Sequence, residues 1–168
     1  SRTYAKWISD KLHADIFESD NISTETLNNY EVIIFVGSLY ASKLIIYKYI
    51  KKFYKKLNKD KKIYCVIVGI SNPQYKELYE DTINKNFKYK EKENITFYFL
   101  RGAIDFSKLK LHHALMMLMF RKILASKNEQ TEDDKIFLEN YGKKIDYLNK
   151  NSINDLVLDV KNYLKEFK

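Results

Sequence analysis

The chain has 168 residues, 45% of them hydrophobic, which excludes a disordered segment and predicts a single globular domain over residues 1–168. Lysine and arginine outnumber aspartate and glutamate by 30 to 22, giving a formal net charge of +8. Most of this excess is lysine interspersed with acidic residues, whereas specific nucleic-acid recognition favours arginine. We therefore expect no nucleic-acid partner, and an anionic surface or acidic partner fits the charge better.

The predicted elements alternate between helices and buried strands along the chain. Residues 14–19 (ADIFES) place apolar side chains at alternate positions, which predicts a short strand. Apolar, β-branched stretches that end in glycine predict buried strands at residues 31–37, 62–69 and 95–102. Apolar side chains spaced three and four apart predict helices at residues 3–12, 44–57, 74–87, 108–126, 132–142 and 152–167. Residues 88–94 (KYKEKEN) are expected to form a charged connector.

This alternation, with no hairpin signals between the strands, predicts an α/β fold with a parallel sheet. In open parallel sheets, ligands bind in the crevice beyond the carboxyl ends of the strands. The functional residues should therefore lie on the loops that begin near residues 37, 69 and 101.

The cellular compartment is predicted from cysteine usage and hydropathy. The lone cysteine, Cys65, lies in an apolar run and is expected to serve packing rather than chemistry. No apolar stretch reaches the roughly 18 residues of a membrane span, and the first residues do not read as a signal peptide. We expect a soluble protein of the cytoplasm.

Familiar catalytic motifs are absent from the sequence. It contains no Gly-x-Ser-x-Gly elbow, Walker loop, GxGxxG or HExxH. The histidines, at positions 13, 112 and 113, have no neighbours in a metal-ligand pattern. The sequence thus predicts neither a metal site nor a catalytic acid–base residue.

The strand ends offer small and polar residues instead. Gly37 and Gly69 would let the backbone approach a flat ligand, and nearby serine and asparagine side chains could hydrogen-bond to a heterocycle. Ser1 and Thr3, ahead of a helix, could cap its first turn or lie beside a phosphate. Each feature also has a purely structural interpretation as a cap, a loop aromatic such as Tyr40, or a turn.

Four segments resemble the flavodoxin family, and in particular its branch of flavodoxin-like protoporphyrinogen oxidases. SRTYAKWISDKL is similar to the end of the phosphate loop and the first helix, and YEVIIFVGSLYASKL to the third strand and first flavin loop. CVIVGISNPQYKE is similar to the fourth strand and second flavin loop. FLRGAIDFSKLKLHHALMMLMFRKIL resembles the fifth strand and the hydrophobic helix that follows it in this branch.

The resemblance implies a doubly wound parallel sheet in the strand order 2-1-3-4-5 that binds FMN at the strand ends. Ser1 and Thr3 match hydroxyl residues of the phosphate loop. The residues that match the loop on one side of the flavin ring are Ser38, Leu39, Tyr40 and Ala41. Those that match the loop on its other side are Ile70, Ser71 and Asn72. The resemblance also places the family's opening strand and most of its phosphate loop before Ser1, so we expect the sequence to be part of a longer protein.

Three functions follow as alternatives. The first is an FMN-binding electron carrier with a redox partner protein. The second is a protoporphyrinogen oxidase-type flavoenzyme that passes electrons from a porphyrin-like substrate to a quinone. Its apolar segment LHHALMMLMFRKIL would be either a core helix or a contact for a membrane surface or hydrophobic substrate. The third is an interaction domain that keeps the fold without flavin.

Overall fold

Three parallel strands form the centre of the computed structural model, which describes residues 1–40 and 43–166. The sheet order is β2-β1-β3-β4, in which β2 runs antiparallel and pairs only with the end of β1. The strands are β1 (Val32–Tyr40), β2 (Lys43–Leu44), β3 (Lys62–Gly69), β4 (Ile95–Arg101), and, as a separate pair, β5 (Ala103–Asp105) and β6 (Lys144–Asp146). The helices are α1 (Arg2–Leu12), α2 (Thr24–Asn28), α3 (Tyr47–Tyr54), α4 (Lys76–Asn86), α5 (Tyr89–Asn94), α6 (Leu111–Ala125), α7 (Glu132–Glu139) and α8 (Asn154–Glu166). The parallel strands and their connecting helices confirm the predicted α/β fold.

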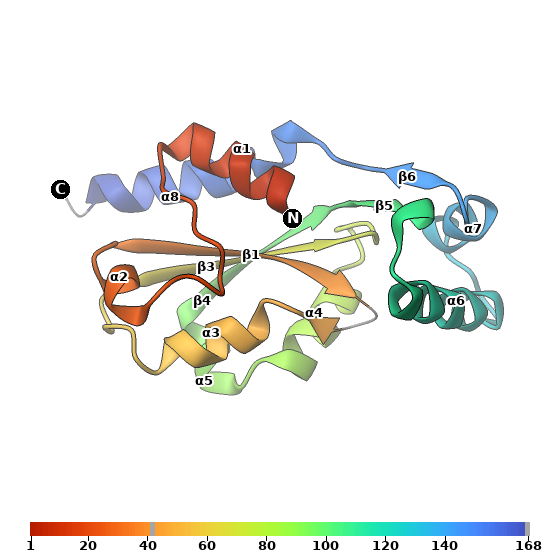
Figure 1. Cartoon of the computed structure of the whole chain (residues 1–168), viewed down its shortest axis with the longest axis horizontal. Coiled ribbons are helices and arrows are strands. Elements are labelled where there is room, and N and C mark those ends of the chain that lie inside the picture. The colour runs from red at the N-terminus through yellow and green to blue at the C-terminus, as the bar shows by residue number, and fades with distance from the viewer. Residues whose placement is uncertain (41–42, 167–168) are drawn as a thin grey trace.

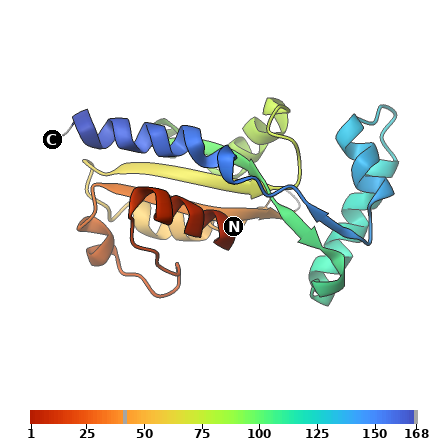
Figure 2. The same ribbon diagram turned by 90° about the horizontal axis from the view of Figure 1, so that it is seen from above.

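Helices cover both faces of the central sheet. Figure 2 shows α1 and α8 on one face, where they pack over Tyr64 and Val66. On the other face α3 and α4 pack over Cys65 and Ile67 (Figure 1). Successive residues of β3 face opposite sides, so this strand is buried on both faces, as its unbroken apolar sequence predicts.

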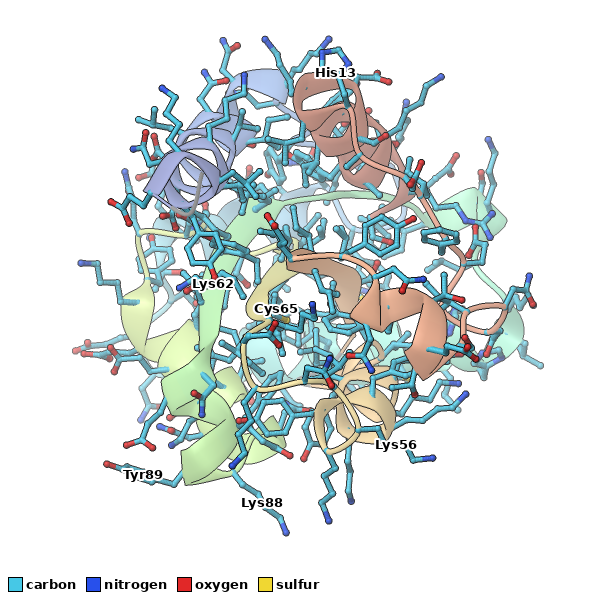
Figure 3. All side chains as sticks on the ribbon, turned by 90° about the vertical axis from the view of Figure 1, so that its left-hand side faces the viewer. His13, Lys56, Lys62, Cys65, Lys88 and Tyr89 are labelled. Atoms are coloured by element: carbon cyan, nitrogen blue, oxygen red, sulfur yellow. The ribbon has the colours of Figure 1, made fainter. Side chains whose placement is uncertain are left out.

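Cys65 occupies the centre of the core, as expected for a packing residue. Figure 3 shows it in the interior, whereas Lys56 and Tyr89 point outward. Its side chain is fully buried, and this burial raises the pKa of the thiol well above its ordinary value. A thiol in such surroundings stays protonated and unreactive.

A third cluster of apolar residues lies beyond the carboxyl ends of the parallel strands (Figure 1). After β4 the chain continues through β5 into α6 and α7, returns through β6, and then enters α8. Met117, Leu124, Phe137 and Ile145 form the buried centre of this unit. The α6 segment therefore packs on α7 and the β5–β6 pair, and not on the main sheet.

Asp134 stabilises the start of α7. Its carboxylate accepts hydrogen bonds from the Thr131 N–H (3.0 Å) and from the Lys127 ammonium (2.8 Å), while its own N–H donates to the Thr131 hydroxyl. Burial alone would raise the pKa of Asp134, but the bonds from Lys127 and Thr131 outweigh it and hold the pKa below the usual range. The polar sequence before α7 thus contains a reciprocal capping box.

Two predicted elements differ from the structure. Residues 88–94, predicted as a connector, contain α5, because the Glu91 carboxylate accepts a hydrogen bond from the Lys88 N–H (2.9 Å) and closes the first turn. Residues 14–19, predicted as a strand, form an irregular and largely exposed segment. That prediction was wrong because a strand requires a neighbour to pair with, and no described strand pairs with this segment.

Candidate functional site

The carboxyl ends of β1, β3 and β4 lie next to one another and define what we call the carboxyl edge. Ser38 of β1 pairs with Val68 of β3, and Gly69 of β3 pairs with Arg101 of β4. The loops predicted to carry function therefore begin side by side, at the edge where parallel sheets bind ligands.

The N-terminus of α1 reaches the carboxyl edge and brings two predicted site residues together. The Ser38 hydroxyl donates to the Ser1 hydroxyl across 3.2 Å, and Ser1 makes no side-chain capping bond to its helix. Thr3 is exposed in the first turn. This turn contains no acidic residue, so its free N–H groups and helix dipole favour an anion.

The first loop lies against the second strand end. A Cβ added at Gly69 would lie 3.7 Å from Leu39 Cδ2, so Leu39 packs beside this glycine. Tyr40 closes β1 by pairing with Lys43 of β2. Ala41 lies outside the described residues, and the prediction that the Tyr40 ring faces the flavin remains untested.

Gly37 has a structural role that the sequence did not reveal. A Cβ at this position would collide with the Cβ and Cγ2 atoms of Ile46, whose side chain fills the space. Position 37 must therefore lack a side chain so that the segment before α3 can pack on β1. The approach of a flat ligand is not needed to explain this glycine.

The second loop is held by bonds to its neighbours. The Ser71 carbonyl accepts from the Tyr79 hydroxyl (2.6 Å), and the Asn72 N–H donates to Asp133 Oδ2 (2.9 Å). Burial raises the pKa of Tyr79 to about 12, so this hydroxyl remains a donor at neutral pH. The Asn72 side-chain amide donates to Gln74 Oε1 (3.4 Å) and accepts from the Gln74 N–H (3.1 Å), so its bonds are local. These hydrogen bonds hold the loop in place, and they use polar groups of the loop that could otherwise bind a ligand.

Arg101 is the centre of these contacts and was not predicted as a site residue. Its Nε donates to the Ile70 carbonyl (3.3 Å), its Nη2 pairs with Asp133 Oδ1 (3.4 Å), and its guanidinium stacks 3.6 Å from the centre of the Tyr147 ring. The sequence signal was an arginine that follows the apolar run of β4 directly. Its partners come from segments 31 or more residues away, which local patterns do not identify.

The cavity enclosed by these residues is too small for a cofactor. It measures about 30 Å³ and lies between Ile70, Arg101, Asp133, Phe137 and neighbouring side chains. Pockets for drug-sized ligands measure roughly 300–1,000 Å³. This cavity therefore has no space for a flavin.

A much larger groove runs along the edge of β1 that faces away from β3. It measures about 860 Å³ and is lined by β1, α1, α3, α8 and the irregular segment after α1. Ser1 and Ser38 mark its end at the carboxyl edge. The groove is thus continuous with the predicted phosphate and flavin positions.

Comparison with known proteins agrees with this architecture. The sequence model of the Flavodoxin domain family matches residues 1–132. The chain belongs to this flavodoxin family. It is also 28% identical over 141 residues to an uncharacterized protein of Methanocaldococcus jannaschii, an alignment that covers 84% of this chain and 86% of that relative. No solved structure matches it.

Among residues 1–40 and 43–166, no group of three or more histidine, cysteine, aspartate or glutamate side chains is arranged to hold a metal ion. Within the same residues, no helix combines the length and apolarity needed to cross a membrane.

Proposed function

We propose that this flavodoxin-family chain binds FMN at the carboxyl edge and transfers electrons through it. The observation that carries the proposal is the contact between Ser1 and Ser38, which joins the α1 N-terminus to the first loop at the predicted flavin position. The absence of acidic residues in the first turn of α1 suits a phosphate group. When bound, FMN would supply the redox chemistry, and the protein would bind and orient it.

Each part of FMN would meet a different part of the edge. Ser1 and Thr3 would hold the phosphate. Ser38, Leu39, Tyr40 and Ala41 would line one side of the ring, and Ile70, Ser71 and Asn72 the other. Because the N–H of Asn72 already donates to Asp133, we expect the second loop to contribute shape and carbonyl groups more than N–H donors.

The test is FMN titration of the full-length protein, followed by flavin fluorescence quenching. We expect saturable binding, and the substitution Tyr40→Ala should weaken it about 5- to 150-fold, by analogy with stacking energies of about 1–3 kcal/mol. Tyr89→Ala is the matched control, because Tyr89 is exposed on α5 ahead of β4 and far from the carboxyl edge. A protein that is colourless and takes up no FMN would contradict the proposal and favour a flavin-free interaction domain.

A second candidate function, an oxidase of the protoporphyrinogen type, is favoured by the outer face of α6. Leu111, Leu115, Met119 and Ile123 repeat every four residues, and their exposed fractions lie between 58% and 88%. Exposed apolar faces of this kind mark interaction sites. We propose that this stripe contacts a hydrophobic porphyrin-like substrate or a quinone within an anionic membrane surface.

Basic residues near the stripe support its contact with an anionic membrane surface. Lys108, Lys110 and Lys122 flank the stripe and would face anionic headgroups. The substitution Leu115→Lys should reduce sedimentation with anionic vesicles, while Leu78→Lys, at a 50% exposed leucine on α4, should leave it unchanged. Turnover of protoporphyrinogen with a quinone acceptor would distinguish the oxidase from the electron carrier, and no turnover would leave the carrier.

A further inference from the structure

The positive charge of the chain is concentrated in one segment. Residues 47–62 contain eight lysines and one aspartate, a net charge of +7 in a chain whose total is +8. The segment comprises α3 and the turn that leads to β3. Three-, four- and seven-residue spacings place its exposed lysines on one helical face, which we call the lysine face: Lys48, Lys51, Lys52, Lys55 and Lys56.

The apolar side of α3 is already part of the core. Ile50, Phe53 and Leu57 are buried against the central sheet. An amphipathic helix that lies in a membrane inserts its apolar side between the lipids. Because this side of α3 is occupied by the sheet, the lysine face can meet a partner only through charge, at the partner's surface.

Carboxylates of the protein neutralise little of this charge. Among the residues that the structure describes, the lysine face makes no ion pair, and Lys61 pairs with its neighbour Asp60 (3.6 Å). Lys48 lies over the Tyr49 ring (4.5 Å), whose hydroxyl donates to Asp20. The remaining lysines of the face are free to attract an external anion.

The lysine face and the outer face of α6 point to the same side of the molecule. Figure 1 shows α3 below the central sheet and α6 below α7. Ile50 of α3 packs toward the sheet, and Met117 of α6 packs toward the α7 unit, so both outer faces point away from these layers. In Figure 3, Lys56 and Lys88 also project on this lower side. One flat surface could therefore contact the lysine face together with the apolar stripe of α6.

We propose that the lysine face binds the headgroups of an anionic membrane. Clusters of four to eight lysines attract anionic lipids, and a basic patch combined with an apolar contact binds more stably than either one alone. The apolar contact would be the α6 stripe, and for this half alone the inference rests on the second candidate function. It requires neither a bound flavin nor oxidase activity.

The composition of the lysine face argues against other anionic partners. The cores of protein–protein interfaces are depleted in lysine and enriched in aromatic residues and arginine. Base recognition uses arginine, and single-stranded nucleic acids stack on aromatic rings along a groove. This face is the convex outside of a helix without arginine, and its Tyr47 ring packs inward on Phe87.

The experiment is sedimentation of the full-length protein with vesicles of phosphatidylcholine, with and without about 30% phosphatidylserine. We expect binding to the anionic vesicles alone, and weaker binding at high salt. A variant with Lys51→Gln, Lys55→Gln and Lys56→Gln should bind about 100-fold more weakly, because each lysine near an anionic surface contributes about fivefold.

The matched control removes the same charge from the opposite side of the sheet. Lys6→Gln, Lys11→Gln and Lys161→Gln change exposed residues of α1 and α8, and together they should weaken binding less than about fivefold. All six lysines are exposed, so neither variant should change the thermal unfolding temperature appreciably.

Four outcomes would overturn the proposal. They are no binding to anionic vesicles at low salt, equal weakening in the two variants, tighter binding to poly(U) RNA or to a polyglutamate peptide than to vesicles, and loss of binding in Leu115→Lys but not in the lysine variant. The last of these would leave the α6 stripe and the second candidate function intact. Vesicle binding through the lysine face by a protein that takes up no FMN would support this inference and contradict only the proposed flavin function.

Discussion

Replacing Arg101 by methionine should destabilise the protein, because this side chain joins β4, the second loop, α7 and the segment after β6. The stack on Tyr147 contributes about 1 kcal/mol. The hydrogen bond to the Ile70 carbonyl contributes about another 1 kcal/mol. The two side chains of the ion pair with Asp133 are only about one-fifth exposed, so the loss of this pair adds about 1 kcal/mol. The Asp133 carboxylate would then keep the Asn72 N–H as a hydrogen-bond donor. The expected decrease in the free energy of unfolding is about 2 to 4 kcal/mol.

Urea and thermal unfolding would measure this change, with a fall in Tm of about 5 to 12 °C for a protein of this size. Arg101→Lys keeps the charge but loses the planar stack, so it should have an intermediate effect. The control is Arg2→Ala, because its ion pair with Glu18 is largely exposed and contributes about 0.5 kcal/mol or less. If Arg101→Met changes stability no more than this control does, the proposed role of Arg101 is refuted.

Substitutions at three further places in the structure test other contacts. Gly37→Ala should lower the free energy of unfolding, measured by urea unfolding, by about 1 to 3 kcal/mol, because the added Cβ has no space. Gly69→Ala should have a smaller effect, because its Cβ would make ordinary contacts. Tyr98→Phe should lower Tm, because it removes the 2.9 Å hydrogen bond to the Asp159 carboxylate. Tyr64→Phe should change Tm less, because the Tyr64 hydroxyl lies near the same carboxylate but makes no hydrogen bond of normal geometry; equal shifts would contradict this. The carboxylate of Asp134 has a depressed pKa in the folded state, so its stabilisation is present above the usual pKa of about 4 and is lost as the pH falls through the lower folded value. Asp134→Asn should therefore reduce stability at neutral pH and weaken its decline in acid, as followed by thermal melts between pH 2 and 7.

The central sheet could be predicted because its information is local. The apolar runs at β1, β3 and β4 admit few conformations other than buried strands. β3 ends at Gly69 and β4 ends before Gly102, as predicted, but β1 continues past Gly37 to Tyr40, so the prediction that this glycine ends the strand was wrong. The position of the carboxyl edge follows from the parallel order alone. The sequence therefore predicted that these strand ends share one edge of the sheet, whereas the role of their residues in binding a ligand stays a prediction.

The remaining features depend on contacts between distant segments. Nothing near Gly37 in the sequence indicates that Ile46 fills the space where its side chain would be. The bond between Arg101 and Asp133 joins positions 32 residues apart. The chain between and after them contains β5 and β6, and strands of three residues are too short to show an alternating pattern of apolar and polar side chains. The segment 14–18 has the pattern of a strand, but pairing is a property of two segments, and its sequence describes only one.

The two halves of the proposed flavin site meet at Ser1, whose hydroxyl lies 3.2 Å from that of Ser38. The free N–H groups of the first turn of α1 and the hydroxyls of Ser1, Thr3 and Ser38 are the groups that these residues offer to a phosphate. Tyr40 would contact the ring and not the phosphate, so Tyr40→Ala should weaken FMN binding with little change in the free energy of unfolding. Measuring both quantities on the same variant would separate a defect of the fold from a defect of the site.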